Sequence, residues 1–186
     1  MGSEMCIRDS VIYMQGGPVR QVKAHNRLMA RSKIPLLTSI DGEWGVRMRL
    51  DSVIRFPRQM LLGAVQDESL VYDMGVEIAK QCSLTGVHVN FAPVVDLNVN
   101  PNNPVINSRS FGEEKVHVTK LSHAYMKGMQ DNTILACAKH FPGHGDTDVD
   151  SHLGLPVISH SKDRLMDVEL YLSLIHISEP TRPYWI

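Results

Sequence analysis

The chain has 186 residues, with 19 lysines and arginines against 20 aspartates and glutamates, and its formal net charge is −1. Hydrophobic residues make up 43% of the sequence, a composition typical of globular proteins that excludes a disordered or collagen-like chain. Nucleic-acid binding depends on clustered basic residues, and a membrane helix needs about 20 apolar residues in a row, so we expect neither nucleic acid nor a membrane as a partner. The three cysteines have no spacing typical of a disulfide framework or a zinc site: Cys6, Cys82 and Cys137.

Short apolar runs alternate along the chain with longer helix-like segments. The apolar runs predict strands over Val11–Gly17, Pro35–Asp41, Val87–Asp96 and Ala136–Gly143. The segments between and after them predict helices within Val19–Lys33, Asp67–Thr85, Glu113–Asn132 and Asp163–Leu172. Strands that alternate with helices of this length predict β-α-β units and a parallel sheet.

Two of the expected helices have apolar residues on one face, which is typical of helices that pack against a core. Asp67 is the expected N-cap of the first, Gly86 is its expected stop signal, and its face consists of Leu70, Met74, Ile78 and Cys82. The face of the second consists of Val118, Leu121, Tyr125 and Met129.

Polar side chains follow three of the expected strands: Asp41, Asp96, and the pair Lys139 and His140. In parallel α/β folds this edge of the sheet carries the active site. Four such units fit half of a (β/α)8 barrel, whose complete form takes about 250 residues. The predicted fold class is therefore α/β, a partial (β/α)8 (TIM) barrel with about the first four β/α units. The alternative is an open doubly wound sheet, which is disfavoured because no G-x-G-x-x-G turn follows the first strand.

The two ends of the chain do not continue the pattern beside them. Met1–Ser10 reads MGSEMCIRDS and Ser173–Ile186 reads SLIHISEPTRPYWI, and both resemble translated sequencing-adapter sequence. We therefore expect residues 1–10 and 173–186 to be non-native tails on a domain of residues 11–172, with the native start and stop missing. A signal peptide would escape notice in such a sequence, so no localisation is assigned.

The segment Lys139–Pro156 reads KHFPGHGDTDVDSHLGLP and has the highest density of chemically active side chains. Its glycines and prolines predict a loop above a strand end. Three interpretations compete for it. The first is a loop whose polar groups are only structural, and the second is acid–base chemistry on a substrate with hydroxyl groups. The third is a metal site with the ligands His140, His144, Asp150 and His152.

The acid–base interpretation centres on Asp150 and His152. Residues two apart in an extended segment point to the same side, and a carboxylate beside an imidazole fixes its tautomer and stabilises its protonated form. The imidazolium can then donate a proton to a leaving group near neutral pH. Lys139 and His140, adjacent at a strand end, can offer donors to sugar hydroxyls or to a carboxylate.

These motifs resemble those of a known family. KHFPGHGDT followed by DSH and LP is similar to the signature of family 3 glycoside hydrolases, in the branch of β-N-acetylglucosaminidases (β-N-acetylhexosaminidases). PLLTSIDGEWG, VNFAPVVDLNVNP and NSRSFGEE resemble that family's second strand, its third strand and the loop that follows. The resemblance runs from about Val11 to about Leu172.

The resemblance implies a (β/α)8 barrel that removes terminal β-linked N-acetylglucosamine with retention of configuration, without a metal or organic cofactor. The implied partner is a carbohydrate, for which a cell-wall fragment is one candidate. The residues implied in substrate binding are Asp41, Arg109, Lys139 and His140. The implied general acid/base is His152, with Asp150 as its partner. The family's nucleophile is an Asp on a later strand, beyond Leu172, so no residue is assigned to that role.

Several alternatives stay open. Family 3 also contains β-glucosidases, although these usually take their acid from a different domain, and a His acid/base is compatible with phosphorolysis. Outside the family, the alternatives are a metal-dependent hydrolase that uses the His and Asp residues and a non-catalytic carbohydrate-binding fragment. Asp96 is expected to bind substrate or, preferentially, to cap a loop, and His144 is expected to shape its loop.

Overall fold

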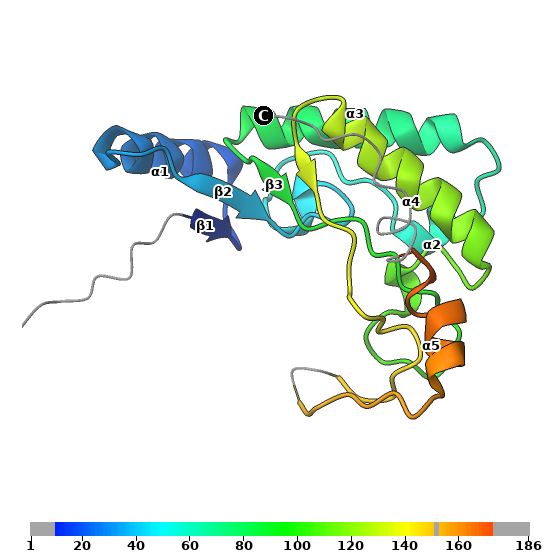
Figure 1. The fold of residues 1–186 in the computed structure, drawn as a ribbon. Helices are drawn as coiled ribbons and strands as arrows, with labels where there is room; N and C mark the ends of the chain where they lie inside the picture. Colours follow the sequence, from blue (N-terminus) through cyan, green and yellow to red (C-terminus); the bar gives the residue numbers. More distant parts are fainter. Residues whose placement is uncertain (1–9, 151–152, 173–186) are drawn as a thin grey trace, which may run out of the picture.

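The computed structural model describes residues 10–150 and 153–172, so His152 lies outside the described residues. Its four strands are β1 (Ser10–Tyr13), β2 (Leu37–Ile40), β3 (Val89–Asn90) and β4 (Leu135–Ala136). They form one parallel sheet in which the strands lie side by side in chain order (Figure 1). This order is that of a (β/α) barrel, because doubly wound sheets reverse their strand order at a switch point. The predicted parallel sheet is confirmed.

Helices lie between the strands along the chain, and one further helix follows β4 (Figure 1). They are α1 (Pro18–Arg31), α2 (Gln59–Leu62), α3 (Glu68–Leu84), α4 (Lys115–Gln130) and α5 (Lys162–Asp167), with 3-10 turns η1 (Val46–Met48) and η2 (Asn107–Arg109). As predicted, Asp67 caps α3 by accepting a hydrogen bond from the Ser69 N–H, and α3 ends before Gly86, which has a φ of 75°. None of the helices in the described part of the chain is long and apolar enough to cross a membrane.

The third and fourth strands are much shorter than predicted, with two residues each. Beyond them the two segments stay side by side through single hydrogen bonds, such as that from Val95 N to Lys139 O at 2.7 Å. Pro93 lies in this stretch and has no N–H to give to a regular ladder. The predicted lengths are therefore wrong, but Lys139 still lies beside Val94 at the carboxyl edge of the sheet.

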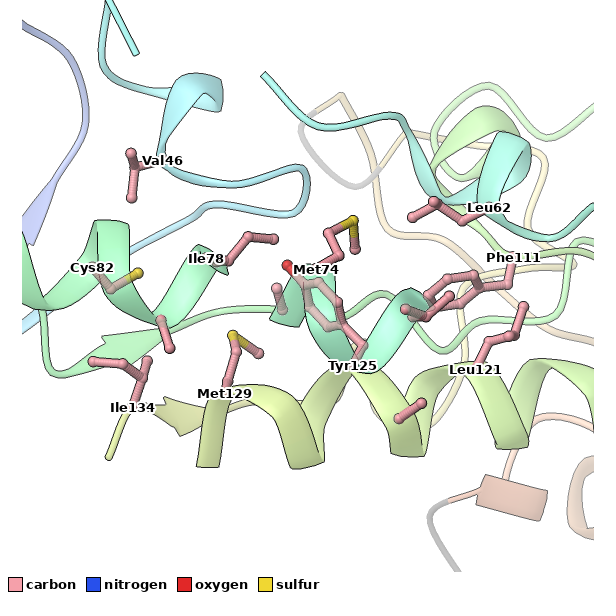
Figure 2. Packing of buried hydrophobic residues seen from close by; sticks show 14 of the residues in the cluster. Val46, Leu62, Met74, Ile78, Cys82, Phe111, Leu121, Tyr125, Met129 and Ile134 are labelled. Atoms are coloured by element: carbon pink, nitrogen blue, oxygen red, sulfur yellow. The ribbon is translucent and has the colours of Figure 1, made fainter. Parts of the chain in front are cut away.

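The core lies mainly between α3 and α4 (Figure 2), where Tyr125 and Met129 of α4 point toward Met74 and Ile78 of α3. All four residues predicted for the buried face of α4 are buried, as are three of the four predicted for α3. The fourth, Leu70, is 58% exposed, whereas Val71 is fully buried. Four residues advance a helix by about 40° more than one turn. A strict spacing of four therefore drifts off the buried face, which makes the prediction for Leu70 wrong.

Candidate active site

Five charged side chains meet at the carboxyl edge of the sheet. Asp41 directly follows β2, Lys139 lies beyond β4, Arg109 closes η2, and Glu43 and Arg49 come from the loop after β2. The Lys139 ammonium lies 2.6 Å from Asp41 Oδ1 and 2.8 Å from Glu43 Oε1. Arg49 Nη2 pairs with the other oxygen of Asp41 at 2.5 Å. We call Asp41, Glu43, Arg49, Arg109 and Lys139 the ionic cluster.

Glu43 is the most buried member of the ionic cluster, with a side chain that is 1% exposed. Arg109 donates to it through two nitrogens, Nε to Oε2 at 2.9 Å and Nη2 to Oε1 at 2.6 Å. This bidentate geometry is the strong form of an arginine–carboxylate pair. Neither Glu43 nor Arg49 is among the residues that the sequence predicts for the site. The signal that could have found them is the presence of charged residues in the short loop after Asp41.

Asp96 holds His140 beside the ionic cluster. Its carboxylate is fully buried; Oδ2 lies 2.6 Å from His140 Nδ1, and Oδ1 accepts a hydrogen bond from the His144 N–H at 2.7 Å. His140 Nε2 lies 3.5 Å from Arg109 Nη2. Since a carboxylate accepts and a guanidinium donates, these partners favour the tautomer with its hydrogen on Nδ1. Asp96 thus caps the loop, the role favoured by the sequence, and also orients His140.

The structure therefore brings together four predicted substrate-binding residues: Asp41, Arg109, Lys139 and His140. The predicted acid/base pair is only partly described. Asp150 is half-buried, and its carbonyl oxygen accepts hydrogen bonds from the N–H groups of Leu153 and Gly154 at 2.9 and 3.0 Å. His152, the predicted acid/base that pairs with Asp150, lies outside the described residues.

The alternative metal site needs the side chains of His140, His144, Asp150 and His152. Within residues 10–150 and 153–172, no three His, Cys, Asp or Glu side chains are arranged to hold a metal ion. His140 and His144 turn their Nδ1 atoms to Asp96 and to Thr147 Oγ1, and their rings meet edge to face with centroids 5.8 Å apart. Contacts to Asp96 and to Thr147 therefore account for the orientation of the two rings.

The ionic cluster keeps its carboxylates charged. Burial would raise the pKa of Asp41, but the hydrogen bonds and charges of Lys139 and Arg49 outweigh it and hold that pKa below its ordinary 3.8. Burial would likewise raise the pKa of Glu43, yet Arg109 and Lys139 hold it below its ordinary 4.5. Burial would lower the pKa of Arg109, and Glu43 raises it instead. Both carboxylates are therefore ionised at neutral pH.

These lowered pKa values predict that acid destabilises the chain through the ionic cluster. Between the folded and unfolded pKa values of Asp41 and Glu43, the unfolded chain binds protons that the folded chain does not, so the free energy of unfolding rises with pH. The contribution is complete above the unfolded values, near 3.8 and 4.5, and is lost as the pH falls through the lower folded values. Urea unfolding from about pH 6 to about pH 3 measures this loss.

Glu43→Gln should flatten this pH dependence, because it removes one of the two shifted carboxylates. Asp73→Asn, on the exposed face of α3, is the matched control and should keep the wild-type dependence. The same loss of stability in acid for wild type and Glu43→Gln would contradict the role of the ionic cluster.

The model of the glycosyl hydrolase family 3 N-terminal domain matches residues 15–177, which is most of the chain. The chain belongs to glycosyl hydrolase family 3. The KHFPGHG segment, which carries the predicted family signature, is the one that delivers Lys139 and His140 to the site. The site described above is therefore a site in a family 3 domain.

Relatives of this family 3 chain are named as β-hexosaminidases. It is 41% identical over 158 residues to β-hexosaminidase A of Pseudoalteromonas piscicida, an alignment that covers 81% of this chain and 26% of the relative. It is 38% identical over 123 residues to β-hexosaminidase LpqI of Mycobacterium tuberculosis, covering 65% of this chain and 32% of the relative. The chain thus spans 26% to 32% of the length of these two relatives.

The similarity extends to solved structures of enzymes that act on glycosides. The fold matches the β-N-acetylglucosaminidase from Paenibacillus sp. strain FPU-7 with a TM-score of 0.83 at 39% identity, covering 91% of this chain and 34% of that one. It matches the β-glucoside phosphorylase BglX with a TM-score of 0.87 at 29% identity, covering 91% and 31%. The four β/α units are therefore part of a (β/α)8 barrel. The predicted fold class is confirmed, and the doubly wound alternative is wrong.

Proposed function

We propose that the chain is part of a retaining β-N-acetylhexosaminidase that removes terminal β-linked N-acetylglucosamine from a carbohydrate. The observation that carries the proposal is the ionic cluster with His140 at the carboxyl edge of a parallel sheet, where barrel enzymes bind their substrates. The names of the relatives support the same activity. A cell-wall fragment is the substrate class that we propose, since bacterial cell walls contain this sugar.

The ionic cluster offers a sugar both kinds of hydrogen-bonding partner. The Asp41 carboxylate accepts hydrogen bonds from hydroxyls, whereas Arg109 and Lys139 donate to them. His140 is held by Asp96 beside Arg109 at the same edge of the sheet. Arg49 joins this proposed set because it shares Asp41 with Lys139. Acceptors and donors that lie side by side suit the adjacent hydroxyls of a pyranose ring.

The proposed chemistry is a double displacement without a metal or organic cofactor. In the first step a carboxylate attacks the anomeric carbon, the bond to the leaving oxygen breaks, and His152 gives its proton to that oxygen. In the second step His152 takes a proton from water, the water oxygen attacks the anomeric carbon, and the carboxylate leaves. Asp150 favours the protonated imidazole in this cycle. The proposed attacking carboxylate is that of an Asp on a later strand of the barrel, beyond Leu172, as the resemblance to the family implies.

A chimaeric enzyme tests this proposal. Residues 11–172 replace the matching segment of the Paenibacillus β-N-acetylglucosaminidase, which is similar in fold and sequence. We call this protein the chimaeric enzyme. It should hydrolyse 4-nitrophenyl N-acetyl-β-D-glucosaminide, and the β-glucoside analogue should be a much poorer substrate. A folded chimaeric enzyme that acts on neither glycoside would overturn the proposed function.

Phosphorolysis is a second candidate, and the similarity to the β-glucoside phosphorylase BglX favours it. In that reaction phosphate replaces water in the second displacement and the sugar leaves as its 1-phosphate. A histidine acid/base leaves room for a phosphate dianion that a second carboxylate would repel. Product analysis in phosphate buffer separates the candidates, because only phosphorolysis yields the sugar 1-phosphate.

We also propose that residues 11–172 are the family 3 unit and that residues 1–10 and 173–186 are additions to it. Ser10 pairs in β1, so the unit is tested with its first strand intact. A chain of residues 10–172 should have the same thermal unfolding midpoint as the whole chain. A lower midpoint for the shortened chain would show that the ends belong to the fold.

Arg109→Ala and Lys139→Ala should each lower kcat/KM of the chimaeric enzyme roughly ten- to hundredfold. Each removes charge-assisted hydrogen bonds, which are worth about 1.5–3 kcal/mol apiece. Steady-state kinetics on 4-nitrophenyl N-acetyl-β-D-glucosaminide measure the loss. Lys80→Ala is the control, since Lys80 forms an exposed pair with Glu77 on α3. Unchanged kinetics for the Arg109 and Lys139 variants would remove both residues from the proposed site.

A further inference from the structure

Glu43 differs from an ordinary surface carboxylate in its burial and in its partners. Both of its oxygens are used, Oε1 by Arg109 Nη2 at 2.6 Å and by Lys139 Nζ at 2.8 Å, and Oε2 by Arg109 Nε at 2.9 Å. The Arg109 and Lys139 side chains are more open, 21% and 14% exposed, against 1% for Glu43. The carboxylate therefore lies on the buried side of two cations.

The backbone beneath Glu43 is fixed from two sides. The fully buried Asn90 side chain accepts from the Gly42 N–H at 2.9 Å and donates to Gly42 O at 3.1 Å. The Tyr125 hydroxyl, also fully buried, donates to Glu43 O at 3.2 Å. A Cβ at position 42 would lie only 3.1 Å from Asn90 Oδ1, so the backbone has little room to shift. The backbone therefore fixes the position of Glu43, and the Arg109 and Lys139 side chains must reach to it.

The position of Glu43 decides which donors of its partners remain for a ligand. Arg109 has Nε and Nη2 engaged by Glu43, and its Nη1 lies 3.2 Å from Val105 O. The Lys139 ammonium faces Asp41 and Glu43, and an ammonium has three N–H donors. The negative charge between the two cations also offsets their mutual repulsion. Removing it would free both side chains to turn away and would leave two cations with too little compensating charge.

We propose that Glu43 is a positioning residue for substrate binding, which holds Arg109 and Lys139 in one geometry and aims their remaining donors at the sugar. This inference rests on the proposed function of the same site. Glu43 acts through its two partners and does not touch the substrate. Donors that are already in place before the ligand arrives bind it more tightly, because their side chains need not be ordered on binding.

A double-mutant cycle in the chimaeric enzyme tests the proposal. Glu43→Gln keeps the shape of the side chain and removes its charge, so kcat/KM should fall at least tenfold. Arg109→Ala should cost much less in the Glu43→Gln background than in the wild type, because the two residues act as one unit. Glu77→Gln, at an exposed carboxylate on α3, is the matched control and should leave kcat/KM unchanged.

NMR of the 186-residue chain gives a measurement that does not depend on activity. The Arg109 Nε–H, bonded to Glu43 Oε2, should exchange slowly with water, and Glu43→Gln should speed that exchange at least tenfold. The same signal of Arg164, which pairs with Glu169, should not change. Fully additive kinetic losses, or an unchanged Arg109 exchange rate, would overturn the role of Glu43 alone. A folded wild-type chimaeric enzyme without activity would instead overturn the proposed function, and the role of Glu43 with it.

Discussion

His152→Ala should lower kcat/KM of the chimaeric enzyme by about 10²- to 10⁴-fold on substrates with poor leaving groups, the scale of general acid catalysis. A sugar or alkyl leaving group needs a proton as its bond to the anomeric carbon breaks. A 4-nitrophenolate is a stable anion that can leave without a proton, so kcat/KM for the aryl glycoside should fall much less. The measurement is kcat/KM on one aryl and one alkyl or sugar glycoside for wild type and variant.

The contrast between leaving groups is the part of this prediction that a structural role would not produce. His123→Ala, at an exposed position on α4, is the control and should leave both substrates unaffected. Asp150→Asn should reproduce the pattern of His152→Ala in a milder form, because it removes the charge that favours the imidazolium but leaves the ring. Equal losses of kcat/KM on substrates with good and poor leaving groups would contradict the acid/base role of His152, but not the family assignment.

Local sequence patterns predicted the parts of the fold that local physics controls. The N-cap at Asp67 and the buried face of α4 depend on residues of the same helix that lie within a few turns of each other, and both are confirmed. The predictions that proved wrong also rested on local sequence patterns. Leu70 fits a spacing of four but not the true pitch of the helix. The lengths of β3 and β4 were overestimated because an apolar run was taken as a full strand, although Pro93 in that run cannot donate to a ladder.

The residues of the candidate site also differ in whether the sequence could predict them. Asp41, Lys139 and His140 were predictable as strand-end residues, because parallel strands place their carboxyl ends on one edge. Glu43 was not predicted: its charge in the loop after Asp41 was the available signal, but its partners Arg109 and Lys139 lie 66 and 96 positions further along the chain. A carboxylate in a loop looks solvated until the fold shows which cations it meets. The sequence suggested two roles for Asp96, and only the structure shows that it orients His140.

Tyr125 connects the hydrophobic core to the candidate site. Tyr125 is fully buried between α3 and α4 (Figure 2), and its hydroxyl donates to Glu43 O at 3.2 Å. Tyr125→Ala should lower the free energy of unfolding of the 186-residue chain by about 3–5 kcal/mol, as for other large aromatic side chains removed from cores. Urea unfolding measures the change.

Tyr125→Phe separates packing from hydrogen bonding in this prediction. It keeps the ring and loses the hydroxyl, so it should cost about 1 kcal/mol, the worth of a typical buried hydrogen bond. Val116→Ala, at a half-exposed position on α4, should stay within about 0.5 kcal/mol of the wild type. Because the lost hydroxyl holds the backbone under the ionic cluster, Tyr125→Phe should also speed exchange of the Arg109 Nε–H. Equal stability losses for the Phe and Ala variants would contradict the packing argument, since the ring would then contribute nothing beyond its hydroxyl.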